Sequence, residues 1–151
     1  MERFICDEML GTLAKWLRIL GFDTEYAKGM DDTDILNKAE NEGRILITRD
    51  RELHGRAIKR KIPAMYLSNA DLKEDLSEVL KEHPPDPDLS MSRCTVCNAP
   101  IEEIEREDAR GKVPEGVFER QERFWRCPKC GRYYWEGSHW ENMRVFLASL
   151  K

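Results

Sequence analysis

Short apolar runs alternate with longer amphipathic stretches through the first half of this chain. Each run is a few residues long and rich in aliphatic or β-branched side chains, which is typical of a buried strand. Between the runs, apolar side chains recur at helical spacing. The expected strands cover residues 4–6, 22–27, 45–47 and 63–67, and the expected helices cover residues 10–20, 33–41, 52–61 and 71–83. This alternation predicts an α/β domain in which helices cover both faces of a small parallel sheet.

The pattern changes at a proline-rich segment, residues 84–92. Repeated prolines cannot continue a helix and favour an extended linker. We therefore place a domain boundary there, with an α/β domain in residues 1–83 and a smaller module in residues 93–151. That module is expected to contain a strand at residues 133–135. Its last helix is expected to be capped by Ser138 and to carry apolar side chains along one side, namely Trp140, Met143, Phe146 and Leu147.

Four of the five cysteines form two CxxC pairs, Cys94 with Cys97 and Cys127 with Cys130. The spacing inside each pair lets both thiolates reach one tetrahedral ion, so the two pairs predict a zinc ribbon. A closed set of four thiolates leaves no position for a substrate, which makes the expected zinc ion structural. The alternatives are redox dithiols or unpaired buried thiols. Cys6 stands alone inside an apolar run and is expected to be a small core residue.

Aromatic side chains surround the second CxxC pair. In a module this small they are expected to build its core, and basic residues beside them raise the alternative of a surface on which bases stack. The aromatic residues are Phe124, Trp125, Tyr133, Tyr134, Trp135 and Trp140, and the basic ones are Arg123, Arg126, Lys129 and Arg132.

Acidic residues follow two of the predicted strands. Asp7 comes directly after residues 4–6, and Asp50 closes the TRD sequence after residues 45–47. If these strands are parallel neighbours, both carboxylates lie at one edge of the sheet and repel each other unless a divalent cation binds between them. Oxygen ligands without a histidine suit Mg²⁺ or Mn²⁺. Further candidates are Glu8, Asp31, Asp32, Asp34 and Asp71, for which solvation of Glu8 and helix capping by Asp31, Asp32 or Asp71 are the alternatives.

Basic residues cluster next to Asp50. They form either a solvated helix face or a rim that binds the backbone of a nucleic acid. Because the chain has a net charge of −4, a polyanion would need such a local positive track. The residues are Arg44, Arg49, Arg51, Arg56, Lys59, Arg60 and Lys61.

The overall composition suits a soluble protein. No apolar run reaches the length of a membrane span, and the sequence enters its first strand without a signal peptide, so we expect a cytoplasmic location and no membrane partner. Residues 1–92 contain 14 basic and 19 acidic side chains, whereas residues 93–151 contain 11 and 10. This balance excludes a protein that binds nucleic acid through bulk charge alone.

Several stretches together resemble a known family. The chain resembles a PIN-type ribonuclease domain in the stretches FICDEMLGTLAKWLRILGFDTEYA and DDTDILNKAENEGRILITRDREL. The closer resemblance is to the C-terminal RNase domain of the mutator-seven exonucleases. In that branch a zinc ribbon follows the nuclease domain, and RCTVCN and CPKCGRYYWEGSHWENM match it. The resemblance implies a PIN-like three-layer fold and a metal-dependent site made of acids. It matches Asp7, Asp34 and Asp50 to the family's acids, with Glu8 as a looser match, and Asp71 is the nearby residue for the fourth acid of many PIN domains.

We therefore expect a metal-dependent ribonuclease in which Asp7, Asp34 and Asp50 hold Mg²⁺ or Mn²⁺. The zinc ribbon assists binding, and the residues expected to hold the substrate backbone are Arg49, Arg51, Arg56, Lys59 and Lys61. RNA as the substrate rests on the resemblance; single-stranded RNA is expected, and a DNA nuclease and a homo-oligomer stay open. The alternative is a non-catalytic RNA- or ribosome-binding zinc-ribbon protein with a vestigial acidic site.

Overall fold

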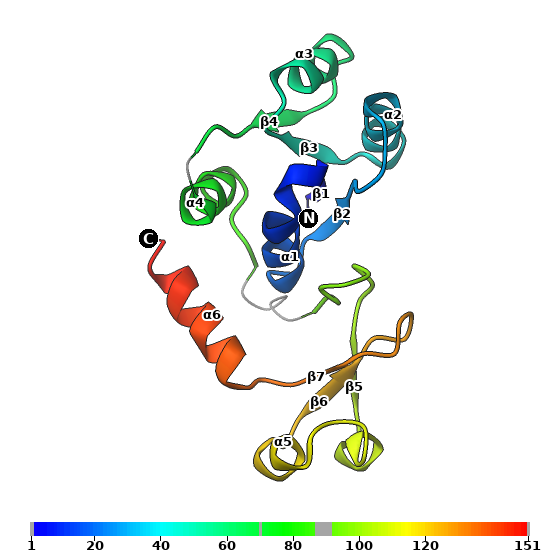
Figure 1. Cartoon of the computed structure of the whole chain (residues 1–151), viewed down its shortest axis with the longest axis vertical. Coiled ribbons are helices and arrows are strands. Elements are labelled where there is room, and N and C mark those ends of the chain that lie inside the picture. The colour runs from blue at the N-terminus through cyan, green and yellow to red at the C-terminus, as the bar shows by residue number, and fades with distance from the viewer. Residues whose placement is uncertain (1, 70, 87–91, 151) are drawn as a thin grey trace. The chain divides into compact units, whose positions relative to one another are not determined.

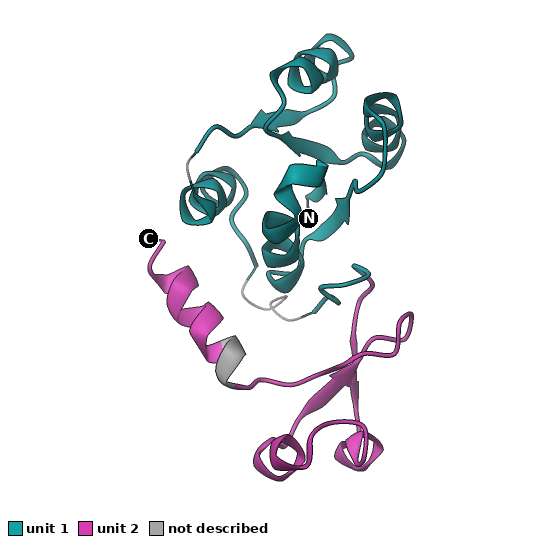
Figure 2. Cartoon of the chain, viewed as in Figure 1, with its two compact units in different colours: residues 1–98 teal, residues 99–151 magenta. Residues whose placement is uncertain are grey.

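The computed structural model describes residues 2–69, 71–86 and 92–150. The chain divides into two compact units, residues 1–98 and 99–151 (Figure 2). The division lies after the first CxxC pair, beyond the proline-rich segment, of which residues 87–91 lie outside the described part. The predicted domain boundary at residues 84–92 stays a prediction.

The first unit contains the predicted alternation of strands and helices, and the α/β class is confirmed (Figure 1). Its elements are β1 (Arg3–Cys6), the short 3-10 helix η1 (Glu8–Leu10), α1 (Gly11–Ile19), β2 (Asp23–Tyr26), α2 (Asp32–Glu42), β3 (Ile45–Thr48), α3 (Arg51–Lys59), β4 (Ala64–Tyr66) and α4 (Leu72–Glu82).

The four strands form one parallel sheet in the order β2-β1-β3-β4. Helices α2 and α3 pack on one face, and α1 and α4 pack on the other (Figure 1). On the α2–α3 face, the paired residues Ile5 and Leu46 join a buried cluster with Leu36 and Leu53. Cys6 and Ile47 are also paired and fully buried, which confirms Cys6 as a core residue. A sheet covered on both faces leaves its strand ends as the accessible place for polar chemistry.

Four aspartates set where the helical segments begin. Their side chains accept hydrogen bonds from backbone N–H groups that have no partner inside the helix. Asp7 caps η1, Asp31 caps α2, Asp50 caps α3 and Asp71 caps α4. Of the two candidate caps for α2, Asp31 has the extended backbone of an N-cap, and Asp32 is the first helical residue.

The second unit contains a three-stranded antiparallel sheet in the order β5-β6-β7. Its elements are β5 (Glu102–Ile104), the 3-10 helix η3 (Arg106–Ala109), α5 (Glu115–Arg120), β6 (Phe124–Arg126), β7 (Tyr133–Tyr134) and α6 (Ser138–Ala148). The sequence pattern does not predict β5 or α5, because both are short and at least half of the residues in each are charged. The predicted strand and final helix are present. The predicted cap by Ser138 is wrong, because Ser138 is the first residue of α6 and the extended N-cap residue is Gly137. The side chains of Ser138 and Trp140 lie outside the described part.

A small aromatic core holds the second unit together. Ala109, Phe118 and Phe124 are buried, and Trp135 packs against them. The rings of Phe118 and Phe124 stack with their centroids 6.0 Å apart. The core interpretation therefore holds for Phe124 and Trp135, whereas Phe118 on α5 is a core residue that the sequence pattern does not reveal.

Candidate functional site

Asp7 and Asp50 lie at the carboxyl ends of two strands of the parallel sheet. Their strands β1 and β3 are adjacent, and the backbone N–H of Asp7 donates to the carbonyl of Ile47 at 3.1 Å. The hydroxyl of Thr48 connects the two acids, because it donates to Asp7 Oδ2 and accepts from the backbone N–H of Asp50 at 3.0 Å. The sequence TRD thus folds into a turn that ties both acids to one threonine.

The Asp7 carboxylate is held by donors on both oxygens. Oδ1 accepts from the backbone N–H of Met9 at 3.1 Å, and Oδ2 accepts from the backbone N–H of Arg49 at 3.0 Å as well as from Thr48. The residue is only 7% exposed. These hydrogen bonds hold the Asp7 carboxylate in one orientation within the turn.

Asp50 is exposed and uses only one oxygen as a helix cap. Its Oδ1 accepts from the backbone N–H groups of Glu52 at 2.8 Å and Leu53 at 3.2 Å. Capping by Asp50 is a role that the sequence could have shown, since an aspartate directly before a helical pattern is a typical N-cap. The second oxygen, Oδ2, makes no hydrogen bond with the described residues, so this carboxylate can serve a further ligand.

The other candidate acids lie at the beginnings of helices. Asp34 is exposed in the first turn of α2, and Asp32 forms an ion pair with Arg56 at 3.7 Å. Glu8 is exposed, and its carbonyl accepts from the Tyr26 hydroxyl at 2.7 Å. Within the part of the chain that the structure describes, these acids form no group of three close enough to hold a metal ion. The set Asp7, Asp34 and Asp50 stays a prediction.

Asp75 is a buried acid that sequence reasoning missed. It is 1% exposed on α4 and forms an ion pair with the guanidinium of Arg49 through Oδ2, while its Oδ1 is buried without a hydrogen-bond partner. Arg49 also donates to the carbonyl of Asn69 at 2.9 Å. The available signal was its position beside Leu72 and Leu76, on the apolar stripe of α4. An acid on a core-facing stripe needs a partner, and Arg49 is that partner.

Two of the basic residues after Asp50 contact neighbouring side chains. Arg51 lies over the ring of Tyr66 at 5.6 Å, and Arg56 donates to the Thr33 hydroxyl at 3.1 Å. Lys59 and Lys61 are exposed at the end of α3 and just after it. The predicted contact of these residues with a substrate backbone stays a prediction.

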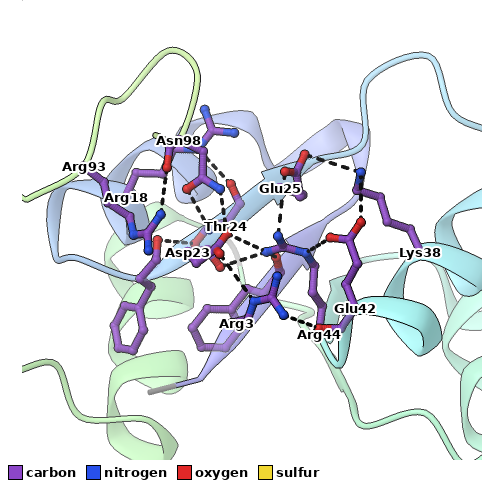
Figure 3. A network of polar contacts seen from close by, with 12 residues as sticks. Arg3, Arg18, Asp23, Thr24, Glu25, Lys38, Glu42, Arg44, Arg93 and Asn98 are labelled. Atoms are coloured by element: carbon purple, nitrogen blue, oxygen red, sulfur yellow. Dashed lines mark hydrogen bonds and ion pairs between the residues drawn. The ribbon is translucent and has the colours of Figure 1, made fainter. Parts of the chain in front are cut away.

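Arg44 does not belong to this basic surface. It is 4% exposed and lies among acids (Figure 3). Its guanidinium donates to Asp23 Oδ1 at 2.8 Å, to Glu42 Oε1 at 2.7 Å and to the carbonyl of Phe4 at 3.1 Å. Arg44 therefore ties β1, β2 and the end of α2 together at the amino ends of the strands, away from the edge that carries Asp7 and Asp50.

This network predicts a specific acid sensitivity. Burial of Asp23 opposes its ionisation, but hydrogen bonds from Arg44 and Asn98 outweigh burial and hold the pKa of Asp23 below its usual value of 3.8. A carboxylate with a lowered pKa in the folded state stabilises the fold fully above pH 3.8, and that stability is lost as the pH falls toward the lower value. Asp23→Asn should therefore weaken the dependence of the unfolding midpoint on pH in this window. Urea unfolding of the wild type and the variant between about pH 5 and pH 3 measures this dependence. Equal changes of the two midpoints with pH would contradict the role of Asp23.

The four paired cysteines lie close enough together to hold one metal ion. The Sγ atoms of Cys94, Cys97, Cys127 and Cys130 all lie within 4.8 Å of one another. Each pair sits in a tight turn, in which the backbone N–H of the residue after the second cysteine donates to the carbonyl of the first, at 3.0 Å in one turn and 2.9 Å in the other. Four thiolates at this spacing fit a tetrahedral zinc ion and leave no open position for a substrate.

Arginines lie over aromatic rings in the second unit. Arg123 lies 5.1 Å from the ring centroid of Trp125, and Arg126 lies 5.9 Å from that of Tyr133. Trp125, Tyr133 and Tyr134 are half-buried rather than core residues. A partly exposed ring beside a guanidinium is a surface on which a base can stack, and this alternative stays open for these three rings.

The comparisons with known proteins identify one family. A family model described as the Mut7-C RNAse domain matches residues 2–147. The curated proteins give no match to this chain. Over the described residues, no helix is both long enough and apolar enough to cross a membrane.

Proposed function

Because the chain belongs to the Mut7-C RNAse domain family, we propose that it is a metal-dependent ribonuclease whose acidic site lies at the carboxyl edge of the parallel sheet. The observation that carries this proposal is the connection of Asp7 and Asp50 through Thr48 at the ends of two adjacent strands. Open α/β sheets bind their ligands at this edge. The family match supports ribonuclease activity in general. We propose the metal dependence from the two acids at the strand ends.

In this proposal Asp7, Asp34 and Asp50 hold Mg²⁺ or Mn²⁺. When bound, such an ion lowers the pKa of a water molecule and neutralises charge on a phosphate. The turn formed by Thr48 and the N–H of Arg49 keeps the Asp7 carboxylate in one orientation. Asp50 holds the start of α3 with one oxygen and can offer the other to the ion.

The substrate in this proposal is single-stranded RNA in the cytoplasm. Lys59 and Lys61 supply exposed positive charge where α3 ends and the chain leads into the amino end of β4, and Arg56 lies on the same helix nearer the acidic residues. A zinc ion in the four-cysteine group keeps the ribbon folded, and its half-buried rings assist binding by stacking on bases.

A paired assay on the full chain tests the proposal. One single-stranded RNA and the DNA of the same sequence are incubated with Mg²⁺, Mn²⁺ or a chelator, and equilibrium binding of both is measured in parallel. Cleavage of RNA that requires the divalent ion is the expected result. Binding without cleavage under every condition would instead identify a non-catalytic RNA-binding protein, and equal cleavage of both strands would identify a nuclease without preference for RNA.

A further inference from the structure

The edge strand β2 is closed by side chains rather than by another strand. In the order β2-β1-β3-β4, β2 lies at one end of the sheet, where unpaired backbone groups invite pairing with other chains. Thr24 is fully buried there. Its backbone N–H donates to Asn98 Oδ1 at 2.9 Å, and its carbonyl accepts from Arg18 Nε at 2.8 Å (Figure 3).

Both of these partners are tied to the turn that contains the first CxxC pair. The backbone N–H of Asn98 closes this turn on the carbonyl of Cys94 at 3.0 Å. Its side-chain amide donates to Asp23 Oδ1 at 2.6 Å. Arg18 donates to the carbonyls of Thr95 at 2.9 Å and Val96 at 3.1 Å. The turn and the edge strand therefore share one hydrogen-bond network inside the first unit.

Arg93 fastens the beginning of the same turn. It donates to the carbonyl of Asn98 at 2.8 Å and to the carbonyl of Gly21 at 3.3 Å. Asn98 itself has a left-handed backbone, with φ at 69°. Few residue types adopt this conformation readily, and asparagine is one of them. Asn98 thus combines the backbone shape that a CxxC turn needs with the amide that pairs with a strand edge.

We propose that the first CxxC turn, residues 93–98, is a metal-dependent cap on the open edge of the parallel sheet. Ligation of Cys94 and Cys97 fixes the turn, and the fixed turn holds Asn98 and the carbonyls of Thr95 and Val96 against β2 and Arg18. This inference does not depend on the proposed nuclease activity.

The physical reason is the cost of ordering a short irregular loop. Residues 93–98 contain no helix or strand with which to hold their shape, so the bound ion supplies the constraint. Without it, the turn gains conformational freedom, and the N–H of Thr24 and the guanidinium of Arg18 lose partners in a place that is 7% exposed or less. The sheet then opens first at β2.

Hydrogen exchange of the full chain tests the cap. Removing zinc with a chelator, or replacing Cys130 in the other CxxC pair by Ser, should speed exchange in β2 (Asp23–Tyr26) by about fivefold or more, the factor for one net hydrogen bond. Exchange in β4 (Ala64–Tyr66), at the opposite edge, should change much less. Returning zinc to the chelated protein should restore protection. Zinc content is measured on every sample.

Asn98→Gly is the matched variant. Glycine keeps the left-handed turn and hence the metal, but it removes the amide from the edge. Exchange in β2 should rise while zinc content stays at the wild-type level. Unchanged β2 exchange after zinc loss would overturn the cap, and so would unchanged exchange in Asn98→Gly. Equal acceleration in β2 and β4 after zinc loss would also overturn it, because the ion would then support the whole unit rather than one edge.

Discussion

Asp50→Asn is expected to reduce metal-dependent RNA cleavage by at least about a hundredfold, the scale of losing one electrostatic contact in a transition state. The substitution removes a charge from the proposed metal site. It does so without disturbing the start of α3, because asparagine caps helices about as well as aspartate. The two hydrogen bonds from Glu52 and Leu53 to Oδ1 can both persist. The unfolding midpoint should therefore stay close to that of the wild type while single-turnover cleavage falls.

Asp7→Asn tests the proposed metal site less directly than Asp50→Asn, because it is expected to change stability as well as activity. Asp7 accepts hydrogen bonds on both oxygens, from Met9 on one and from Thr48 and Arg49 on the other. An amide nitrogen in place of either oxygen would face a donor, so this variant should lose stability as well as activity.

RNA binding by Asp50→Asn should equal or exceed that of the wild type, because a negative charge near the phosphates is gone. Retained cleavage in Asp50→Asn would mean that Asp50 is only a helix cap.

Substitution of the basic side chains should weaken RNA binding and leave cleavage largely intact, which is the reverse of the result expected for Asp50→Asn. Lys59→Glu together with Lys61→Glu should weaken binding of single-stranded RNA and lower the dependence of affinity on salt, by about 0.7 in the log–log slope for each lost phosphate contact. Cleavage at saturating RNA should be largely retained. Both lysines are exposed, so the unfolding midpoint should hardly move. Titrations at several salt concentrations measure the slope, and an unchanged slope would place the RNA elsewhere.

The strand and helix order was predictable because each element buries one periodic apolar face. Leu36, Leu46 and Leu53 pack into one core at the positions that their spacing implies. The adjacency of β1 and β3 follows from no local pattern, since strand order depends on long-range pairing. The sequence places Asp7 and Asp50 after strands, and the topology makes those strands neighbours.

Polar residues were harder to predict because the same residue type serves several roles. Asp31, Asp50 and Asp71 are helix caps, Asp75 is a buried ion-pair partner, and Arg44 is buried rather than exposed. A charge pattern records how many charges lie nearby in sequence, but burial and pairing depend on tertiary contacts. The first CxxC turn shows the same limit, because its spacing predicts metal ligation and not the hydrogen bonds of Asn98 and Arg18 to Thr24.

Arg49→Met is expected to lower the free energy of unfolding by about 3 kcal/mol, the low end for breaking a buried ion pair. The low end applies because the Arg49 side chain is 27% exposed, whereas that of Asp75 is 1% exposed. The variant leaves the Asp75 carboxylate buried without a cation, and one of its oxygens already lacks a partner. It also frees the TRD turn, because Arg49 anchors that turn to the carbonyl of Asn69. Urea unfolding of the zinc-loaded full chain measures the change.

Two further variants separate this structural role from the predicted contact of Arg49 with a substrate. Arg49→Met combined with Asp75→Leu removes both charges and should recover most of the lost stability, since the cost lies in the uncompensated carboxylate. Arg51→Met is the matched control on the exposed neighbour and should cost less than about 0.5 kcal/mol. If Arg49→Met unfolds like the wild type but binds RNA more weakly, Arg49 acts on the substrate. If stability falls and the double variant restores it, the role of Arg49 is structural. Its ion pair with Asp75 then holds the turn whose backbone N–H orients Asp7.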